Sequence, residues 1–184
     1  MKIKYISAGI CGLSCRLCPN YHTESKSRCP GCKSAYRMAA GCPFITCALK
    51  KKGVEFCVEC PDNNSCILWK KHRAAGKKKY SFKCYQTLEA DIKYAQEHGV
   101  AGFEKIQKQR EKLLEKMLSS YNDGRSKSFY CIAATVMGID ELKKSIKEAE
   151  RRTVGPEMKA KSAVMHTVIE SVAAEKGYVI KLRK

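Results

Sequence analysis

The stretch CGLSCRLCPNYHTESKSRCPGCKSAYRMAAGCPFITCALKKKGVEFCVECPDNNSC (residues 11–66) holds ten of the twelve cysteines of the 184-residue chain. Three cysteine pairs within it are separated by two residues, namely Cys15/Cys18, Cys29/Cys32 and Cys57/Cys60. A tight turn across two intervening residues directs both sulfur atoms to one point, which is how thiolates hold a metal ion. The spacing therefore predicts a metal-binding module.

A fourth pair, Cys42 and Cys47, is looser, with four residues between its members. Eight thiolates suffice for two tetrahedral zinc sites. The sequential assignment gives the first site Cys15, Cys18, Cys29 and Cys32, and the second site Cys42, Cys47, Cys57 and Cys60. A crossed arrangement of the pairs is equally good chemistry.

Cys11 and Cys66 are left over by this assignment. Either could replace a member of one site, or both could form a third site with His22. The polar neighbours of His22 favour a solvated loop residue instead.

An iron–sulfur cluster is the alternative cofactor, because four cysteines can hold either zinc or a [4Fe–4S] cluster. Cys11, Cys15 and Cys18 also have the C-x3-C-x2-C spacing of radical SAM enzymes. The chain that follows does not alternate strands and helices, and this disfavours such chemistry. An iron–sulfur protein would have a redox or sensing role.

The chain contains no uninterrupted apolar run of about 18 residues, so no membrane span or membrane partner is expected. Its first residues lack the pattern of a signal peptide. We therefore expect a cytoplasmic protein, in which a reducing environment favours metal-bound cysteines over disulfides.

The composition is strongly basic, with 36 Lys and Arg against 18 Asp and Glu and a formal net charge of +18. Such a charge attracts polyanions without specifying one. The candidate nucleic-acid contacts lie in the basic stretch 69–83 and are Lys70, Lys71, Arg73, Lys77, Lys78 and Lys79. Because the rings among them are few, a partly helical linker anchored to the core by its aromatic residues is the favoured interpretation.

Residues 84–184 have a helical pattern, so we expect a cysteine-rich module over 1–68, a connector over 69–83 and a helical module over 84–184. Gly99 is expected to stop a first helix, and apolar residues from Phe103 to Tyr121 predict a second. The apolar run 129–137 fits a strand or a helix, and its two alanines favour a helix. It contains Cys131, expected to pack as a small hydrophobe.

Two further helices and two short strands complete the prediction. Asp140 is expected to cap a helix that ends at Arg152. Pro156 is expected in the first turn of the last helix. Met158 is expected to face the core from this helix, and Gly177 is expected to end it. Alternating residues predict strands at Ile3 and Tyr5 and at Tyr178, Ile180 and Leu182, which could pair with each other. The predicted fold class is α-rich, with a loop-rich cysteine module.

Catalytic signatures are scarce. The chain has no P-loop, no dinucleotide-binding glycine motif and no deaminase motif. The carboxylates Glu55 and Glu59 flank Cys57 and are interpreted as softening local positive charge. Complete four-cysteine zinc sites leave no position open for a substrate. The favoured function is thus a non-catalytic adaptor that binds protein or nucleic acid, with the oligomeric state open.

The strings CGLSCRLCP, CPGC and CPFITCALKKKGVEFCVEC, followed by Cys66, resemble a prokaryotic cysteine-rich family of unknown function, number 3795. The resemblance continues in NDGRSKSFYCIAATVMGIDELKKSIKEAE (residues 122–150) and in the closing YVIKLRK. It implies metal binding by the cysteines and a two-module plan, without a substrate.

Overall fold

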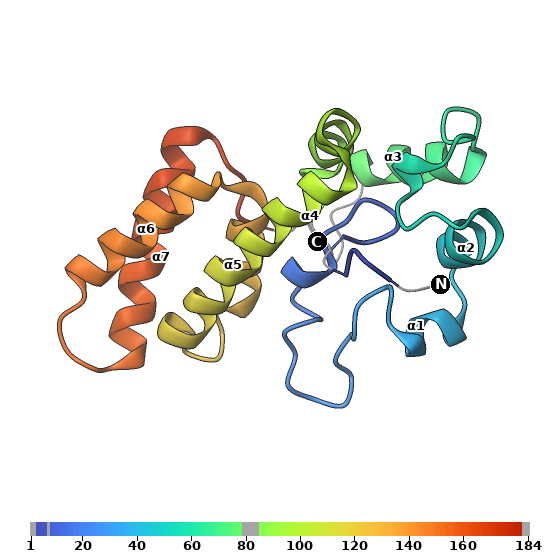
Figure 1. Cartoon of the computed structure of the whole chain (residues 1–184). Coiled ribbons are helices and arrows are strands. Elements are labelled where there is room, and N and C mark those ends of the chain that lie inside the picture. The colour runs from blue at the N-terminus through green and yellow to red at the C-terminus, as the bar shows by residue number, and fades with distance from the viewer. Residues whose placement is uncertain (1–2, 7, 79–84, 182–184) are drawn as a thin grey trace. The chain divides into compact units, whose positions relative to one another are not determined.

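The structure is a computed structural model that describes residues 3–6, 8–78 and 85–181, apart from the side chains of Ala40, Lys77 and Lys78. Helices dominate it (Figure 1), so the predicted α-rich fold class is confirmed. The α-helices are α1 (Ala35–Ala40), α2 (Pro43–Ile45), α3 (Ile67–Lys78), α4 (Leu88–Tyr121), α5 (Lys127–Val136), α6 (Ile139–Arg152) and α7 (Met158–Lys176). Short turns of other helical types are η1 (Cys15–Leu17), η2 (Thr46–Lys52) and η3 (Cys57–Glu59).

The chain divides into two compact units, of which the first ends at Lys108 and the second begins at Gln109. The division falls inside α4, whereas the sequence places the connector at residues 69–83. Part of that stretch belongs to α3, whose Trp69 is buried in the core of the first unit.

The core of the first unit joins the cysteine-rich loops to α3 and α4. Its buried side chains are Ala8, Leu13, Phe56, Trp69, Leu88, Ile92, Ala95, Val100 and Phe103. The rings of Phe56 and Phe103 stack with their centroids 5.7 Å apart. A Cβ atom at Gly12, which has φ +89°, would lie 2.8 Å from the Leu88 side chain. This close approach explains the glycine beside Cys11.

Gly99 interrupts α4, with φ 72° and ψ 164° in an otherwise helical run. The prediction that the first helical segment stops there is confirmed. Leu88 and Ile92 before the break and Phe103 after it all belong to the same buried cluster. The break thus lets two helical segments cover one core.

The second unit consists of the end of α4 with α5, α6 and α7. Helix α5 contains the apolar run around Cys131, which is a helix as favoured, and Cys131 is buried. Helices α6 and α7 pack against each other side by side (Figure 1). The Arg110 guanidinium donates to the carbonyl oxygens of Ala134 and Met137 at 2.7 and 2.5 Å. It thereby provides hydrogen-bond donors for carbonyl groups at the C-terminal end of α5.

The predicted strands are wrong for the residues that the structure describes, because neither Ile3 and Tyr5 nor Tyr178 and Ile180 form a strand there. The backbone N–H of Tyr5 donates to the Glu55 carboxylate at 2.9 Å instead of to a partner strand. Leu182 lies outside the described residues. Among the described residues, a single isolated antiparallel bridge pairs Ala8 with Ser14.

Three details of the last helices differ from expectation. The residue that precedes α6 is Gly138 and not Asp140. The N–H of Gly138 donates to Glu141 Oε2 at 2.8 Å, so the Glu141 side chain caps the helix in place of Asp140. Pro156 lies before α7 rather than in its first turn. Met158 is 37% exposed because it begins that helix. Gly177 ends α7 with φ 71°, as predicted.

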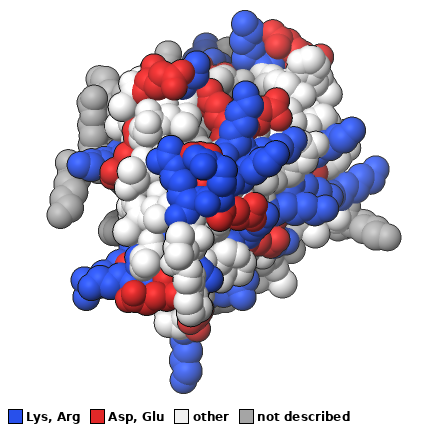
Figure 2. Space-filling model, turned by 90° about the vertical axis from the view of Figure 1, so that its left-hand side faces the viewer, with Lys and Arg blue, Asp and Glu red and all other residues white. Residues whose placement is uncertain are grey.

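Acidic groups are interspersed among the more numerous Lys and Arg side chains on the face shown in Figure 2. Glu148, for example, accepts hydrogen bonds from Arg151 and Arg152 within α6. Across residues 3–6, 8–78 and 85–181, no helix has the length and apolar character needed to cross a membrane.

Candidate metal centre

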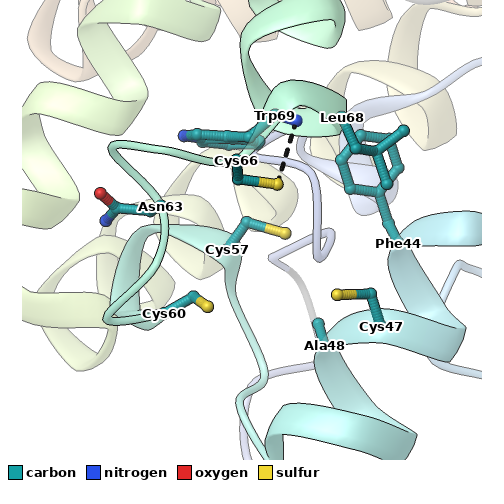
Figure 3. A pocket seen from close by; sticks show the side chains of 9 residues that line it. All are labelled: Phe44, Cys47, Ala48, Cys57, Cys60, Asn63, Cys66, Leu68 and Trp69. Carbon is teal, nitrogen blue, oxygen red and sulfur yellow. Dashed lines mark hydrogen bonds between the residues drawn. The ribbon is translucent and has the colours of Figure 1, made fainter.

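Four cysteines from three segments line one pocket of the first unit: Cys47 of η2, Cys57 and Cys60 of the η3 turn, and Cys66 just before α3. Their sulfur atoms point into the space between them (Figure 3). The apolar part of the wall comes from Phe44, Ala48, Leu68 and Trp69. The pocket encloses about 320 Å³ of empty space, part of it open to solvent.

Backbone hydrogen bonds hold these cysteines in place. The N–H of Cys57 donates to the carbonyl oxygen of Ile10 at 2.9 Å, and the N–H of Cys60 donates to the carbonyl oxygen of Cys57 at 3.2 Å, which closes the η3 turn. At the start of α3, the N–H of Trp69 donates to the sulfur of Cys66 at 3.4 Å. The Trp69 N–H beside the Cys66 sulfur suits a thiolate, because it stabilises negative charge.

The thiols of this pocket lie close enough to influence one another. Burial, followed by the charges of Cys11, Cys66, Cys47 and Cys60, raises the pKa of Cys57 to about 12. Clustered thiols resist losing their protons one after another, since each new negative charge repels the next. A bound cation removes that repulsion.

A second group of cysteines lies around the CPGC turn. The thiols of Cys15 and Cys32 are hydrogen-bonded, and this contact, followed by burial, raises the pKa of Cys15 well above its ordinary value. The N–H of Cys18 donates to the carbonyl oxygen of Cys15 at 3.2 Å, and the N–H of Cys29 donates to the carbonyl oxygen of Asn20 at 2.8 Å. The guanidinium of Arg37 donates to the Cys29 sulfur at 3.7 Å.

The pocket lining differs from the sequential assignment at two cysteines, of which Cys66 is one that the sequence left open as a replacement ligand. Cys42 is absent from the pocket lining and packs instead beside Ile10, Ile45 and Ala48. Cys66 takes a place in the lining, because α3 begins there and brings its sulfur to the pocket. Within the described parts of the chain, no three Cys, His, Asp or Glu side chains stand together at positions that would already hold a metal ion.

A buried ion pair beside the CPGC turn was not foreseen either. Lys33 Nζ donates to the Tyr5 carbonyl oxygen at 2.6 Å and lies 3.2 Å from Glu55 Oε2. Burial lowers the pKa of Lys33 despite the opposing charge of Glu55. Burial alone would raise the pKa of Glu55, but N–H donation from Lys4 and Tyr5, together with Lys33, outweighs it and lowers that pKa. The only sequence feature that could have indicated this ion pair is a lysine next to Cys32 in a region with few acidic residues.

Two histidines of the first unit, the candidate His22 and also His72, contact backbone carbonyl oxygens. His22 hydrogen-bonds the Arg16 carbonyl oxygen at 2.6 Å through Nε2. His72 was not singled out by the sequence, and its Nε2 lies 2.9 Å from the carbonyl oxygen of Cys11. Its ring stacks on Trp69 at a centroid distance of 5.8 Å, which links α3 to the loop that carries Cys11.

The basic stretch offers fewer free cations than its sequence suggests. Lys70 and Lys71 are exposed on α3, whereas Arg73 forms a two-bond pair with Glu89 at 2.9 and 2.5 Å. Trp69 is buried rather than displayed for base stacking. The side chains of Lys77 and Lys78, together with Lys79, Tyr80, Phe82 and Cys84, are not among those the structure describes.

Comparison with known families assigns a class to the cysteine-rich part of the chain. Residues 7–71 match a family model described as "Protein of unknown function (DUF3795)". The resemblance drawn from the cysteine strings is therefore confirmed over these residues. The matched range covers all ten clustered cysteines and ends within α3. Neither a curated protein nor a solved structure was found to match.

Proposed function

We propose that the cysteine-rich part of the chain binds metal ions, with zinc as the metal, and that the protein is a non-catalytic binding protein. The observation that carries this proposal is the pocket lined by Cys47, Cys57, Cys60 and Cys66. Four thiolates complete the tetrahedral coordination of zinc and leave no position for a substrate. Modest movements of the turns would bring the sulfurs onto one ion.

The proposed first ion is held by Cys15, Cys18, Cys29 and Cys32. The contact between Cys15 and Cys32 supports this set, as does the cation of Arg37 beside Cys29. The hydroxyl oxygen of Ser14, next to Cys15, is buried and has no hydrogen-bond partner among the described residues. A thiolate at this site would offer such a hydroxyl an acceptor, which fits a metal-loaded state.

The proposed second ion has two candidate ligand sets, which differ by one cysteine. The pocket favours Cys66, whereas chain spacing favours Cys42. In Cys66→Ser the protein purified without oxygen is expected to contain about one zinc ion instead of two, because three thiolates hold zinc far less firmly. The matched variant Cys42→Ser is expected to retain both ions. Elemental mass spectrometry measures the zinc content, and the reverse pattern would restore the ligand set predicted from spacing.

A [4Fe–4S] cluster is the second candidate, favoured by one observation. The charge of a fifth thiol, Cys11, which does not line the pocket, contributes to the raised pKa of Cys57. The pocket walls include the apolar side chains of Phe44 and Trp69. Cysteine-rich apolar surroundings also suit iron–sulfur clusters. The anaerobically purified protein is expected to be colourless if zinc is bound. Brown protein with iron and acid-labile sulfide would overturn the choice of zinc.

We further propose that the metal-bound module presents its positive charge to an acidic protein partner. Exposed lysines on η2 and α3, such as Lys50, Lys51 and Lys70, provide the charge. Single-stranded nucleic acid would need exposed rings for stacking, and Trp69 is buried. The proposed role is therefore that of an adaptor whose basic surface is shaped by its metal sites.

A further inference from the structure

The loop that separates the first two C-x2-C turns holds two arginines around a single aromatic ring. The guanidinium carbon of Arg16 lies 4.5 Å from the centroid of the Tyr21 ring, and that of Arg28 lies 5.0 Å from it. The Arg16 guanidinium donates to the Tyr21 hydroxyl group, and Arg28 Nε donates to the Tyr21 carbonyl oxygen at 2.9 Å. These three side chains are called the arginine–tyrosine cluster below.

Hydrogen bonds within the loop fix the cluster. The N–H of Tyr21 donates to the carbonyl oxygen of Cys18 at 2.9 Å, and the N–H of Arg28 donates to the carbonyl oxygen of Ser25 at 2.9 Å. The ring of His22 meets the Tyr21 ring edge-on, with the centroids 5.2 Å apart. The guanidinium groups are therefore held in place before a partner binds, which lowers the entropic cost of binding.

The Arg28 guanidinium keeps donors that the described residues do not use. A guanidinium carries N–H donors on all three of its nitrogens. Among the described residues, only Nε of Arg28 has an acceptor, so the donors on its two terminal nitrogens face solvent or a ligand. Arg73 and Arg151, by contrast, form ion pairs with Glu89 and Glu148.

No carboxylate of the loop neutralises the cluster. Glu24 is the only acid among residues 1–54, and its side chain is exposed. It forms no ion pair or hydrogen bond with another described residue. One ring attracts a cation, but two cations beside the same ring repel each other. A carboxylate bound to both guanidinium groups would replace this repulsion with attraction.

We propose that Arg16 and Arg28, held around Tyr21, form the docking site for the carboxylates of an acidic protein segment. This inference rests on the acidic partner of the proposed function, and it places the specific contact in this loop instead of on the exposed lysines of η2. A guanidinium binds a carboxylate through two parallel hydrogen bonds, a geometry that a lysine ammonium does not offer. Arginine and tyrosine are also enriched among the residues that contribute most to protein interfaces.

The Tyr21 ring favours a protein segment over a single-stranded nucleic acid. Binding of a single strand depends on ring faces on which bases can stack. Tyr21 already uses its ring for the two guanidinium groups and for the edge of His22. Another ring, that of Tyr36 on α1, is 68% exposed, so the test also includes RNA.

The test measures the binding of three probes to the full chain, purified without oxygen, by fluorescence anisotropy. The probes are a labelled glutamate-rich peptide, the same peptide with glutamine in place of glutamate, and a labelled oligouridylate with the net charge of the acidic peptide. The variants are Arg16→Gln/Arg28→Gln, which removes both charges, and Arg28→Lys, which keeps the charge without the planar donor group. The matched control is Lys50→Gln/Lys51→Gln, which removes equal charge from exposed lysines of η2.

The double variant Arg16→Gln/Arg28→Gln is expected to bind the acidic peptide at least about tenfold more weakly, because both guanidinium groups supply charge-assisted hydrogen bonds. The control Lys50→Gln/Lys51→Gln should lose no more than about threefold, since water and salt screen exposed charges away from the contact. Arg28→Lys should lie between the wild type and the double arginine variant, and the glutamine peptide should not bind. If the double arginine variant loses its metal or its circular dichroism spectrum changes, Arg28→Lys decides.

Other outcomes separate this inference from the proposed function. Equal losses in the two double variants, or wild-type affinity of Arg28→Lys, would overturn the docking site and leave an acidic partner attracted by diffuse charge. A wild-type chain that does not bind the acidic peptide would overturn the acidic partner and the docking site with it, whereas zinc binding is tested by the metal content. Tighter binding of the oligouridylate, lost in Arg16→Gln/Arg28→Gln, would assign the cluster to RNA phosphates and overturn the protein partner.

Discussion

The carboxylate of Asp123 shows how a single side chain organises the start of a helix. Asp123 Oδ1 accepts hydrogen bonds from the N–H of Arg125 at 3.1 Å and from Ser126 Oγ at 2.9 Å. Ser126 Oγ also lies 2.8 Å from His166 Nε2 and 2.9 Å from Ser162 Oγ. One carboxylate therefore orients a hydroxyl that connects α5 to α7.

These donors, with the N–H of Arg125 the largest contribution, lower the pKa of Asp123 in the folded protein. A carboxyl with a lowered folded pKa contributes stability above its unfolded pKa of about 3.9 and loses it as the pH falls through the folded value. We expect the Asp123 carboxyl carbon to titrate at lower pH in the folded chain than in urea, as followed by ¹³C NMR. Asp123→Asn should weaken the second unit at pH 7 and remove this part of its acid sensitivity. Identical titrations in both states would contradict the assignment.

Among the helices, the break in α4 depends on one glycine. Gly99 combines φ 72° with ψ 164°, a region that is essentially restricted to glycine. Its added Cβ would meet no atom within 4 Å, so the cost of substitution is backbone strain and not a clash. Gly99→Ala is expected to lower the free energy of unfolding of the first unit by about 1–3 kcal/mol.

Urea unfolding of the metal-loaded protein measures this loss. The control is Gly102→Ala, because Gly102 lies in the regular part of α4. It is expected to change the free energy of unfolding by less than about 1 kcal/mol. Equal effects of the two substitutions would show that α4 can straighten through Gly99 without strain.

The helices could be predicted from sequence where their residues contact one continuous core. Leu88, Ile92 and Ala95 recur at helical spacing, and all three are buried. The predicted strand at Ile3 and Tyr5 failed because alternation does not reveal a hydrogen-bond partner. The partner is the carboxylate of Glu55, fifty residues away from Tyr5 in the chain.

In the candidate site, too, local features could be predicted from the sequence and long-range contacts could not. Pairs at short spacing, such as Cys57 and Cys60, form their own turn, so they could be found from local sequence. Cys66 enters the pocket only because α3 begins there and packs Trp69 into the core. Cys42 and Cys47 are close in sequence but have different surroundings. Which pairs share a pocket is a tertiary property.

Over the whole molecule, the cysteines are concentrated in the first part of the chain, whereas the positive charge is spread along its whole length. Residues 1–68 contain ten Lys and Arg against the four acids Glu24, Glu55, Glu59 and Asp62. Metal-bound thiolates would add negative charge to this part, and the basic excess offsets it. The second unit has a core of its own, with Leu114, Tyr130, Leu142 and Ile169 among its buried side chains. If the cysteines bind metal as proposed, we therefore expect the two units to depend on that metal to different degrees.

On the proposal that the cysteines bind zinc, removal of the metal is expected to unfold the cysteine-rich loops and leave α5, α6 and α7 folded, because the proposed thiolate sites all lie in those loops. The measurement is hydrogen exchange after treatment with a strong chelator under anaerobic, reducing conditions. Backbone amides between Cys15 and Cys66 should lose protection, whereas those of α6 and α7 should keep it.

The double variant Cys29→Ser/Cys32→Ser should reproduce part of this loss without a chelator. Cys131→Ala, which alters a buried cysteine of α5, should retain wild-type zinc content. Unchanged protection of the cysteine-rich loops after complete loss of metal would show that their apolar core alone is sufficient for folding.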